Sequence, residues 1–108
     1  MRSEHVRGQL DLLLLSVLAV GGPAHGYAII AALRERSGGQ FDLPEGTVYP
    51  ALHRLEREGL VASGWDESSS RRRRRYVITG AGTAALVAKR SEWQTFARGV
   101  QAVVRWAT

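Results

Sequence analysis

The chain has 108 residues, enough for one domain with a modest hydrophobic core. It contains no cysteine, which excludes disulfides, thiol catalysis and thiolate metal sites. The net charge of +5 and the pI of about 10.7 favour acidic partners such as nucleic acid. Most of this charge is local, because the consecutive arginines Arg71–Arg75 and the C-terminal segment supply it.

The apolar run Leu12–Val20 follows Arg2 and Arg7 and therefore imitates a secretion signal. However, Glu4 and Asp11 interrupt its charged region, and no small-residue cleavage site is clear. The run is also shorter than the stretch of about twenty apolar residues that crosses a bilayer. We therefore expect a cytoplasmic protein that does not interact with membranes.

Two helices are predicted in the first third of the chain, after a frayed segment at residues 1–8. The first spans Gln9–Val20 and is apolar on nearly all sides, so it needs cover from more than one direction. In so small a domain, we expect a second chain to supply part of that cover. The second helix runs from about His25 to Arg36. Its inward stripe is expected to comprise Tyr27, Ile30, Ala31, and Leu33 or Arg34.

A third helix is predicted to end at Gly59, which fits the left-handed position that follows a helix. Its start is ambiguous, because Pro44 also fits a first helical position, where its missing N–H is not needed. We favour Thr47 as the N-cap, or an irregular first turn, because Pro50 then falls where no backbone N–H is required. The apolar face has i, i+4, i+7 spacing and consists of Val48, Leu52 and Leu55. A short helix with a polar outer face suits a DNA groove, although ordinary amphipathic helices share the pattern.

A β-hairpin is predicted after this helix, with strands at residues 60–65 and 76–79. The connection Asp66–Arg75 is long and charged, so we interpret the hairpin as a β-wing. Five adjacent arginines repel one another, which on its own is typical of a solvated loop. However, the two helices, the turn and the polar-faced third helix before it make a helix-turn-helix arrangement. Directly after such an arrangement, the same run favours contact with DNA phosphates or the minor groove.

A long C-terminal helix of about 40 Å is predicted from about Ala81 to Trp106. Its apolar stripe repeats imperfectly every seven residues and extends beyond the preceding domain, so it must be buried elsewhere. The simplest partner is the same helix of a second copy, which predicts a homodimer. The expected interface residues are Leu12, Leu86, Trp93, Phe96, Val100, Val103 and Val104.

Three motifs resemble the PadR family of bacterial transcriptional regulators. They are His25-Gly26-Tyr27, the segment Gly46–Leu60, and the basic run that leads into Tyr76–Gly82. Together they cover nearly the whole chain, and the single C-terminal helix resembles the short PadR subfamily. The resemblance implies a mainly α fold with a small β-hairpin, in which residues 1–79 form a winged helix-turn-helix and residues 80–108 a dimerisation helix.

The resemblance also implies a function. Such a dimer binds double-stranded DNA at a palindromic operator, usually represses transcription, and is often released by a small aromatic molecule. In the family the third helix enters the major groove and the wing touches the backbone or minor groove. The positions implied to bind DNA are Gly46, Thr47, Tyr49, Pro50, His53, Arg54, Arg71, Arg72, Arg73, Arg74 and Arg75. Five arginines in a row depart from the family pattern.

Some short members bind flat aromatic drugs between paired tryptophans at the dimer centre. Trp93 matches that tryptophan, and the neighbouring ligand-binding positions implied by the resemblance are Asp11, Leu12, Ala85, Lys89 and Ala97. Many members have a filled dimer core instead. Plain packing of Trp93 at the two-fold axis is therefore an equal alternative.

The sequence contains no paired carboxylates and no Ser-His-Asp or Cys-His pattern, so we do not expect an enzyme. The histidines lack metal-ligand spacing, and neither a metal nor a cofactor is expected. Two alternatives to a regulator share some of these features. One is a sequence-neutral nucleic-acid-binding protein, and the other is a module that binds a different protein through its C-terminal helix.

Overall fold

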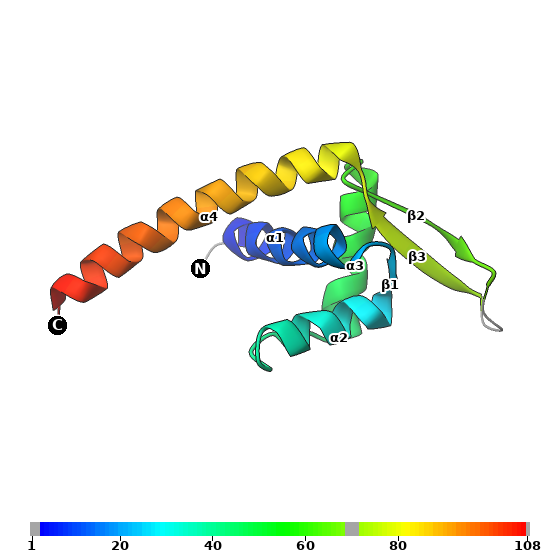
Figure 1. The fold of residues 1–108 in the computed structure, drawn as a ribbon, viewed down its shortest axis with the longest axis horizontal. Coiled ribbons are helices and arrows are strands. Elements are labelled where there is room, and N and C mark those ends of the chain that lie inside the picture. Colours follow the sequence, from blue (N-terminus) through cyan, green and yellow to red (C-terminus); the bar gives the residue numbers. More distant parts are fainter. Residues whose placement is uncertain (1–2, 69–71, 108) are drawn as a thin grey trace.

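The computed structural model describes residues 3–68 and 72–107 of the chain. A long C-terminal helix extends past a small helical domain, and a twisted hairpin projects from the opposite end (Figure 1). The helices are α1 (Ser3–Gly21), α2 (Gly26–Arg36), α3 (Glu45–Arg57) and α4 (Gly80–Ala107), and the strands are β1 (Ala24–His25), β2 (Val61–Asp66) and β3 (Arg73–Ile78). This arrangement confirms the predicted fold class, a mainly α winged helix with a small β-sheet and a long final helix.

The hydrophobic core lies where α1, α2 and α3 meet the base of the hairpin. The predicted apolar face of α3 is fully buried there. Burial of each such side chain stabilises the fold by about 1.5–3 kcal/mol. The fully buried core residues include Leu14, Leu15 and Leu18 of α1, Ile29 of α2, Val48, Leu52 and Leu55 of α3, and Val61 and Tyr76 of the hairpin.

The first two helices differ from their predicted form. Helix α1 begins at Ser3 instead of following a frayed segment. In α2 the buried residues are Gly26, Ile29 and Leu33. The predicted inward stripe is therefore confirmed at Leu33, and Ile30 packs against the core, but Tyr27 is 61% exposed and was placed in the stripe wrongly. The reason lies in α3, because a Cβ atom at Gly26 would overlap the ring of Tyr49. Because α3 approaches α2 closely at Gly26, the face of α2 that contains Gly26, Ile29 and Leu33 points into the core.

Helix α3 begins at Glu45, and Pro44 is its N-cap residue, so the expected start at Thr47 is also wrong. The Pro44 carbonyl accepts hydrogen bonds from the N–H groups of Thr47 and Val48, at 3.0 and 3.1 Å. These bonds close the first turn of the helix at residues that were expected to precede it. Pro50 therefore lies inside the helix and cannot donate to the Gly46 carbonyl. Both residues are exposed, so the missing bond falls on the outer side of α3.

The hairpin belongs to a three-stranded antiparallel sheet with the strand order β1-β3-β2. The two-residue strand β1 was not predicted, and it pairs Ala24 with Tyr76 and His25 with Arg75. Strand β3 starts at Arg73, earlier than predicted, because its pairing with β2 continues as far as Asp66. Several arginines therefore lie in a paired strand and not in the connecting loop.

The start of α4 is attached to the beginning of the hairpin. The Thr79 hydroxyl donates to the Gly59 carbonyl at 2.7 Å and accepts from the Gly82 N–H at 3.0 Å. A Cβ atom at Gly82 would overlap the Leu60 carbonyl, so only glycine allows this approach. From there α4 continues for 28 residues, with α1 alongside its first part (Figure 1).

Candidate nucleic-acid interface and neighbouring groove

The outer face of α3 carries polar and conformationally restricted side chains that do not contribute to the core. Gly46, Thr47, Pro50 and His53 are all exposed. Tyr49 is only half-buried, since its ring covers Gly26 of α2. Burial, followed by the nearby charge of Glu45, raises the pKa of the Tyr49 hydroxyl above its ordinary value.

Arg54 differs from these exposed residues of α3, because its side chain points toward α1. Its Nη2 donates to Asp11 Oδ1 at 2.6 Å and its Nη1 to Asp11 Oδ2 at 3.0 Å, a bidentate pair. The side chains are 17% and 5% exposed, respectively. The hydrogen bond to Asp11 is the main reason why the pKa of Arg54 is raised. The structure therefore places Arg54 in a link between α1 and α3, away from the outer face where the resemblance put it.

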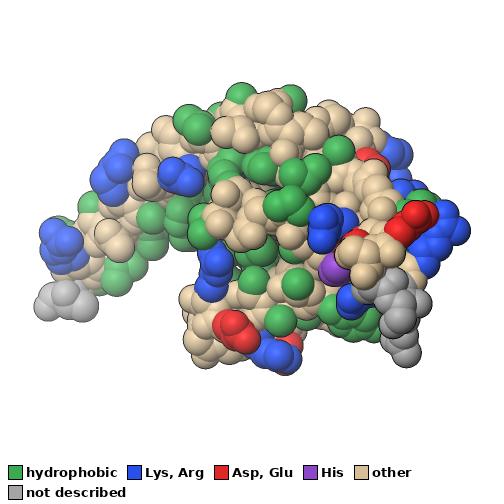
Figure 2. Space-filling model, turned by 45° about the vertical axis from the view of Figure 1, so that its right-hand side comes forward, with side chains coloured by type: hydrophobic (Ala, Val, Ile, Leu, Met, Phe, Trp, Pro, Cys, Tyr) green, Lys and Arg blue, Asp and Glu red, His purple; other side chains and the backbone are tan. Residues whose placement is uncertain are grey.

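The structure sorts the arginines of the wing into two faces. Because side chains alternate along β3, Arg74 lies on one face and Arg73 and Arg75 lie on the other. Arg72 precedes β3 and lies on the side of Arg74, because both contact Trp65. The ζ carbons of Arg72 and Arg74 lie 4.4 and 4.6 Å from the centroid of the Trp65 ring. Arg71 lies outside the described residues. Figure 2 shows basic side chains gathered at the end of the molecule that carries the wing.

On the other face, a buried carboxylate joins the wing to the helix-turn-helix. Asp66 Oδ2 lies 2.7 Å from His25 Nε2 and 3.5 Å from Arg75 Nη2. Asp66 Oδ1 accepts from the backbone N–H of Ser68 at 3.0 Å and from its hydroxyl at 2.5 Å. The Ser68 hydrogen bonds, followed by His25 and the charge of Arg75, hold the pKa of Asp66 well below its usual range.

Sequence reasoning missed this cluster, which depends on β1. One local signal was present, because an Asp followed two residues later by Ser is typical of a turn closed by the carboxylate. The contact between His25 and Asp66 joins residues 41 positions apart and had no such signal.

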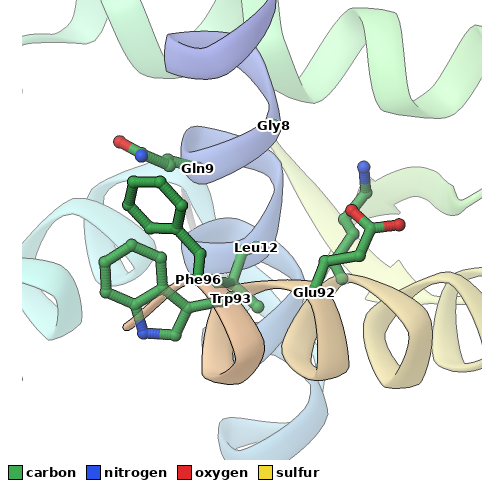
Figure 3. Close-up of a pocket in the computed structure, with 7 residues that line it drawn as sticks. Gly8, Gln9, Leu12, Glu92, Trp93 and Phe96 are labelled. Atoms are coloured by element: carbon green, nitrogen blue, oxygen red, sulfur yellow. The ribbon is translucent and has the colours of Figure 1, made fainter. Parts of the chain in front are cut away.

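A hollow of about 380 Å³ lies between α1 and α4. Its lining residues are Gly8, Gln9, Leu12, Lys89, Glu92, Trp93 and Phe96. The Trp93 and Phe96 rings lie together at one side of it, with centroids 6.0 Å apart, and Glu92 lies at the other side (Figure 3). The hollow is open to solvent, and the two rings are 44% and 53% exposed.

The structure brings together only part of the ligand set that the resemblance implied. Leu12, Lys89 and Trp93 line the hollow. Asp11 is instead held by Arg54, and Ala85 packs against the core. Ala97 is half-buried but is not among the lining residues.

The expected dimer residues differ in exposure. Leu12 is half-buried and Trp93 is 44% exposed. Leu86 is only 3% exposed and belongs to the core of the single chain, which leaves little of it for a partner. The apolar face farther along α4 is exposed and comprises Phe96, Val100, Val103 and Val104.

Two kinds of feature are absent from the part of the chain that the structure describes. Within residues 3–68 and 72–107, no helix is long and apolar enough to cross a membrane. The same part of the chain contains no group of three or more His, Asp or Glu side chains that could hold a metal ion.

Comparison with known proteins identifies the family. Residues 14–88 match the transcriptional regulator PadR-like family. The chain is 31% identical over 94 residues to an uncharacterized protein X of Lysinibacillus sphaericus, covering 86% of this chain and 85% of that protein. It is 42% identical over 67 residues to the transcriptional regulator Rv3488 of Mycobacterium tuberculosis, covering 62% and 63% of the two chains.

Solved structures agree with the sequence comparisons. A transcriptional regulator from Clostridium thermocellum has a TM-score of 0.81 and 31% identity, over 94% of this chain and 95% of that one. A PadR family transcription regulator from Clostridium difficile has a TM-score of 0.73 and 37% identity, over 88% and 96%. The chain therefore belongs to the PadR-like family, whose members are transcriptional regulators and not enzymes.

Proposed function

We propose that the protein is a dimeric repressor that binds a palindromic operator and leaves it when a small aromatic ligand binds. One observation supports the DNA-binding part above all. The exposed outer face of α3 belongs to the same small domain as a hairpin whose Arg72–Arg75 segment is exposed. A polar helix face and a row of cations are the two surfaces that base readout and phosphate binding require.

The two surfaces have different tasks in this proposal. The wing arginines bind phosphates, which supplies affinity that depends on salt but not on base sequence. Helix α3 enters the major groove, where Thr47 and His53 offer exposed hydrogen-bonding groups to the base edges. Arg54 has no direct part, because Asp11 occupies its guanidinium. Its contribution is to hold α3 against α1.

The exposed apolar face of α4 supports the dimer. Phe96, Val100, Val103 and Val104 all leave at least 44% of their surface exposed in the single chain. A second copy of α4 would bury this stripe, as two chains with a seven-residue repeat do. Two copies of α3 would then read half-sites about one DNA turn apart, roughly 34–36 Å.

The hollow beside Trp93 supports a ligand at the dimer centre. Two adjacent aromatic rings, a cation and a carboxylate line it, which suits a flat aromatic molecule with polar substituents. Such a ligand would release DNA only if it favoured one angle between the subunits over another. The alternative is that the partner chain, and not a ligand, fills the hollow and buries Trp93.

Footprinting on the promoter DNA beside the protein's own gene would test the proposal. We expect a protected inverted repeat with half-sites about one helical turn apart. Unrelated competitor DNA should displace the protein far less readily than operator DNA. Equal displacement by both DNAs would contradict the proposal and indicate sequence-neutral binding. The variant Arg98→Ala is a suitable control, since it removes an exposed cation from α4 and leaves the wing intact.

A further inference from the structure

The wing holds an aromatic side chain that contacts two of its arginines. Trp65 pairs with Arg74 across the hairpin, and Arg72 lies two residues before Arg74, just before β3 begins. Both guanidiniums lie against the indole, with ζ carbons 4.4 and 4.6 Å from the ring centroid. Trp65 is nevertheless 50% exposed, so the contacts form at the surface and not in a core.

These contacts restrict two cations that would otherwise be mobile. Adjacent guanidiniums repel each other, and long side chains at a hairpin surface have many rotamers. The negative face of an indole attracts a guanidinium at this distance. The ring therefore offsets part of the repulsion and reduces the number of conformations that Arg72 and Arg74 adopt.

The charge of these two arginines remains available to a ligand. Arg75, on the opposite face, lies 3.5 Å from the buried carboxylate of Asp66, which compensates its charge. Among the residues that the structure describes, no ion pair joins Arg72 or Arg74 to a carboxylate. The contact with Trp65 orders the two guanidiniums but leaves their net charge unchanged.

We propose that Trp65 is a positioning residue for DNA binding. Its indole holds Arg72 and Arg74 as a preformed pair of phosphate-binding cations, so less side-chain freedom is lost when the wing meets the DNA backbone. This inference rests on the proposed DNA-binding function and adds a role for an aromatic residue that does not itself contact DNA. It also distinguishes Arg72 and Arg74, which the indole orders, from Arg75, whose charge Asp66 compensates.

The test compares variants that keep or remove the aromatic face. Trp65→Leu keeps apolar bulk on the strand but has no π face, and Trp65→Phe keeps one. Affinity for the footprinted operator is measured at several salt concentrations. We expect Trp65→Leu to weaken binding by about tenfold for operator and unrelated DNA alike, since two cation–π contacts are lost. The slope of log affinity against log salt should stay near that of wild type, because both cations remain to contact phosphate, and Trp65→Phe should bind nearly as well as wild type.

The decisive measurement is the same substitution in a second background. When Arg72→Ala and Arg74→Ala are already present, Trp65→Leu should cause no further loss, because its effect passes through these arginines. An additive loss would show that Trp65 contacts DNA itself and would overturn the positioning role. The matched control is Val77→Ala, which trims another partly exposed apolar side chain of the same hairpin and should bind normally.

Other outcomes separate this inference from the function on which it rests. If wild-type protein binds no operator, both fail. If wild type binds and Trp65→Leu binds equally well, only the inference fails. The contact can also be measured without DNA in a Trp93→Phe and Trp106→Phe background, where Trp65 is the sole tryptophan. Its emission should shift when Arg72 and Arg74 become alanine, and unchanged emission would overturn the proposed contact.

Discussion

At the scale of single residues, the carboxylates of Asp11 and Asp66 have the most specific environments. As whole residues, Asp11 is 4% exposed and Asp66 is 8% exposed, and each accepts hydrogen bonds from side chains distant in sequence. Buried charges of this kind are costly to leave unpaired. Each therefore joins two elements, with Asp11 connecting α1 to α3 and Asp66 connecting the wing to the start of α2.

Removal of one partner of the α1–α3 link should destabilise the domain. We expect Arg54→Ala to lower the free energy of unfolding by about 3 kcal/mol, because it leaves the Asp11 carboxylate buried without its partner. Urea unfolding monitored by circular dichroism measures this change. Replacement of both residues by leucine should recover much of the lost stability, since no unpaired charge then remains.

A different result would restore the DNA-binding role implied by the resemblance. If Arg54→Ala unfolds at the wild-type urea concentration but loses operator affinity, its guanidinium contacts DNA and the link to Asp11 contributes little.

The environment of Asp66 predicts that the stability of the protein depends on pH in the acidic range. Its pKa is lowered in the folded protein, chiefly by the Ser68 hydrogen bonds, so the unfolded chain binds more protons as pH falls below the ordinary value of 3.8. The stabilisation is therefore complete above that value and is lost as pH decreases toward the folded pKa. Asp66→Asn should be less stable than wild type at neutral pH, and the difference should shrink below about pH 4.

Urea unfolding of both proteins at neutral pH and at about pH 3 would check this prediction. Glu67→Gln is the matched control, because this neighbouring carboxylate is exposed and should show little change. A constant difference between wild type and Asp66→Asn at both pH values would contradict the proposed network.

Among the elements of the fold, we expect substitutions in α3 and in the wing to change DNA affinity in different ways. We expect His53→Ala to weaken binding to the operator by about tenfold, as the loss of one base contact does, while binding to unrelated DNA stays unchanged. Substitution of the wing arginines should instead weaken both and reduce the salt dependence. Electrophoretic mobility shifts with the two DNAs would separate these effects.

The control for His53→Ala is Gln40→Ala, an exposed polar residue in the connection before α3. It should bind both DNAs as wild type does. Equal weakening of both DNAs by His53→Ala would indicate that this side chain contacts the backbone and does not select bases.

At the scale of the whole molecule, the exposed stripe of α4 determines the assembly in our proposal. We expect Val100→Glu combined with Val103→Glu to give monomers, because two carboxylates would be buried in the interface without partners. Sedimentation velocity would measure the mass, and Ser91→Glu, on the opposite face of the seven-residue repeat, should remain a dimer. If wild type itself sediments as a monomer, neither paired half-sites nor a shared central site can exist.

The hollow beside Trp93 gives a second prediction at this scale. We expect Trp93→Ala to loosen the dimer or to abolish the fluorescence response to planar aromatic dyes, since its ring forms one wall. Trp106→Ala is the control, because that tryptophan is 89% exposed and lies outside the lining. Survival of both dimer mass and dye binding in Trp93→Ala would contradict either role for this residue.

Local sequence patterns predicted the order of the four helices and the two hairpin strands, the buried face of α3 and the family. These features depend on local signals: the period of Val48, Leu52 and Leu55, the glycine stop at Gly59, and motifs that are continuous in the chain. The end of α3 was accurate for this reason. Its start was wrong because Pro44 and Thr47 both satisfy the local rules, and the choice depends on which carbonyl closes the first turn.

The partners of the individual charged side chains depend on the fold and could not be predicted from local patterns. Arg54 and Asp11 are 43 positions apart, and His25 and Asp66 are 41 apart, so no local pattern pairs them. The five arginines are chemically identical in the sequence, and it is the register with Trp65 and Asp66 that gives them different partners. Such side-chain roles are therefore set by packing. An exposed arginine is a candidate for DNA contact, whereas an arginine that pairs with a buried carboxylate links two elements of the fold.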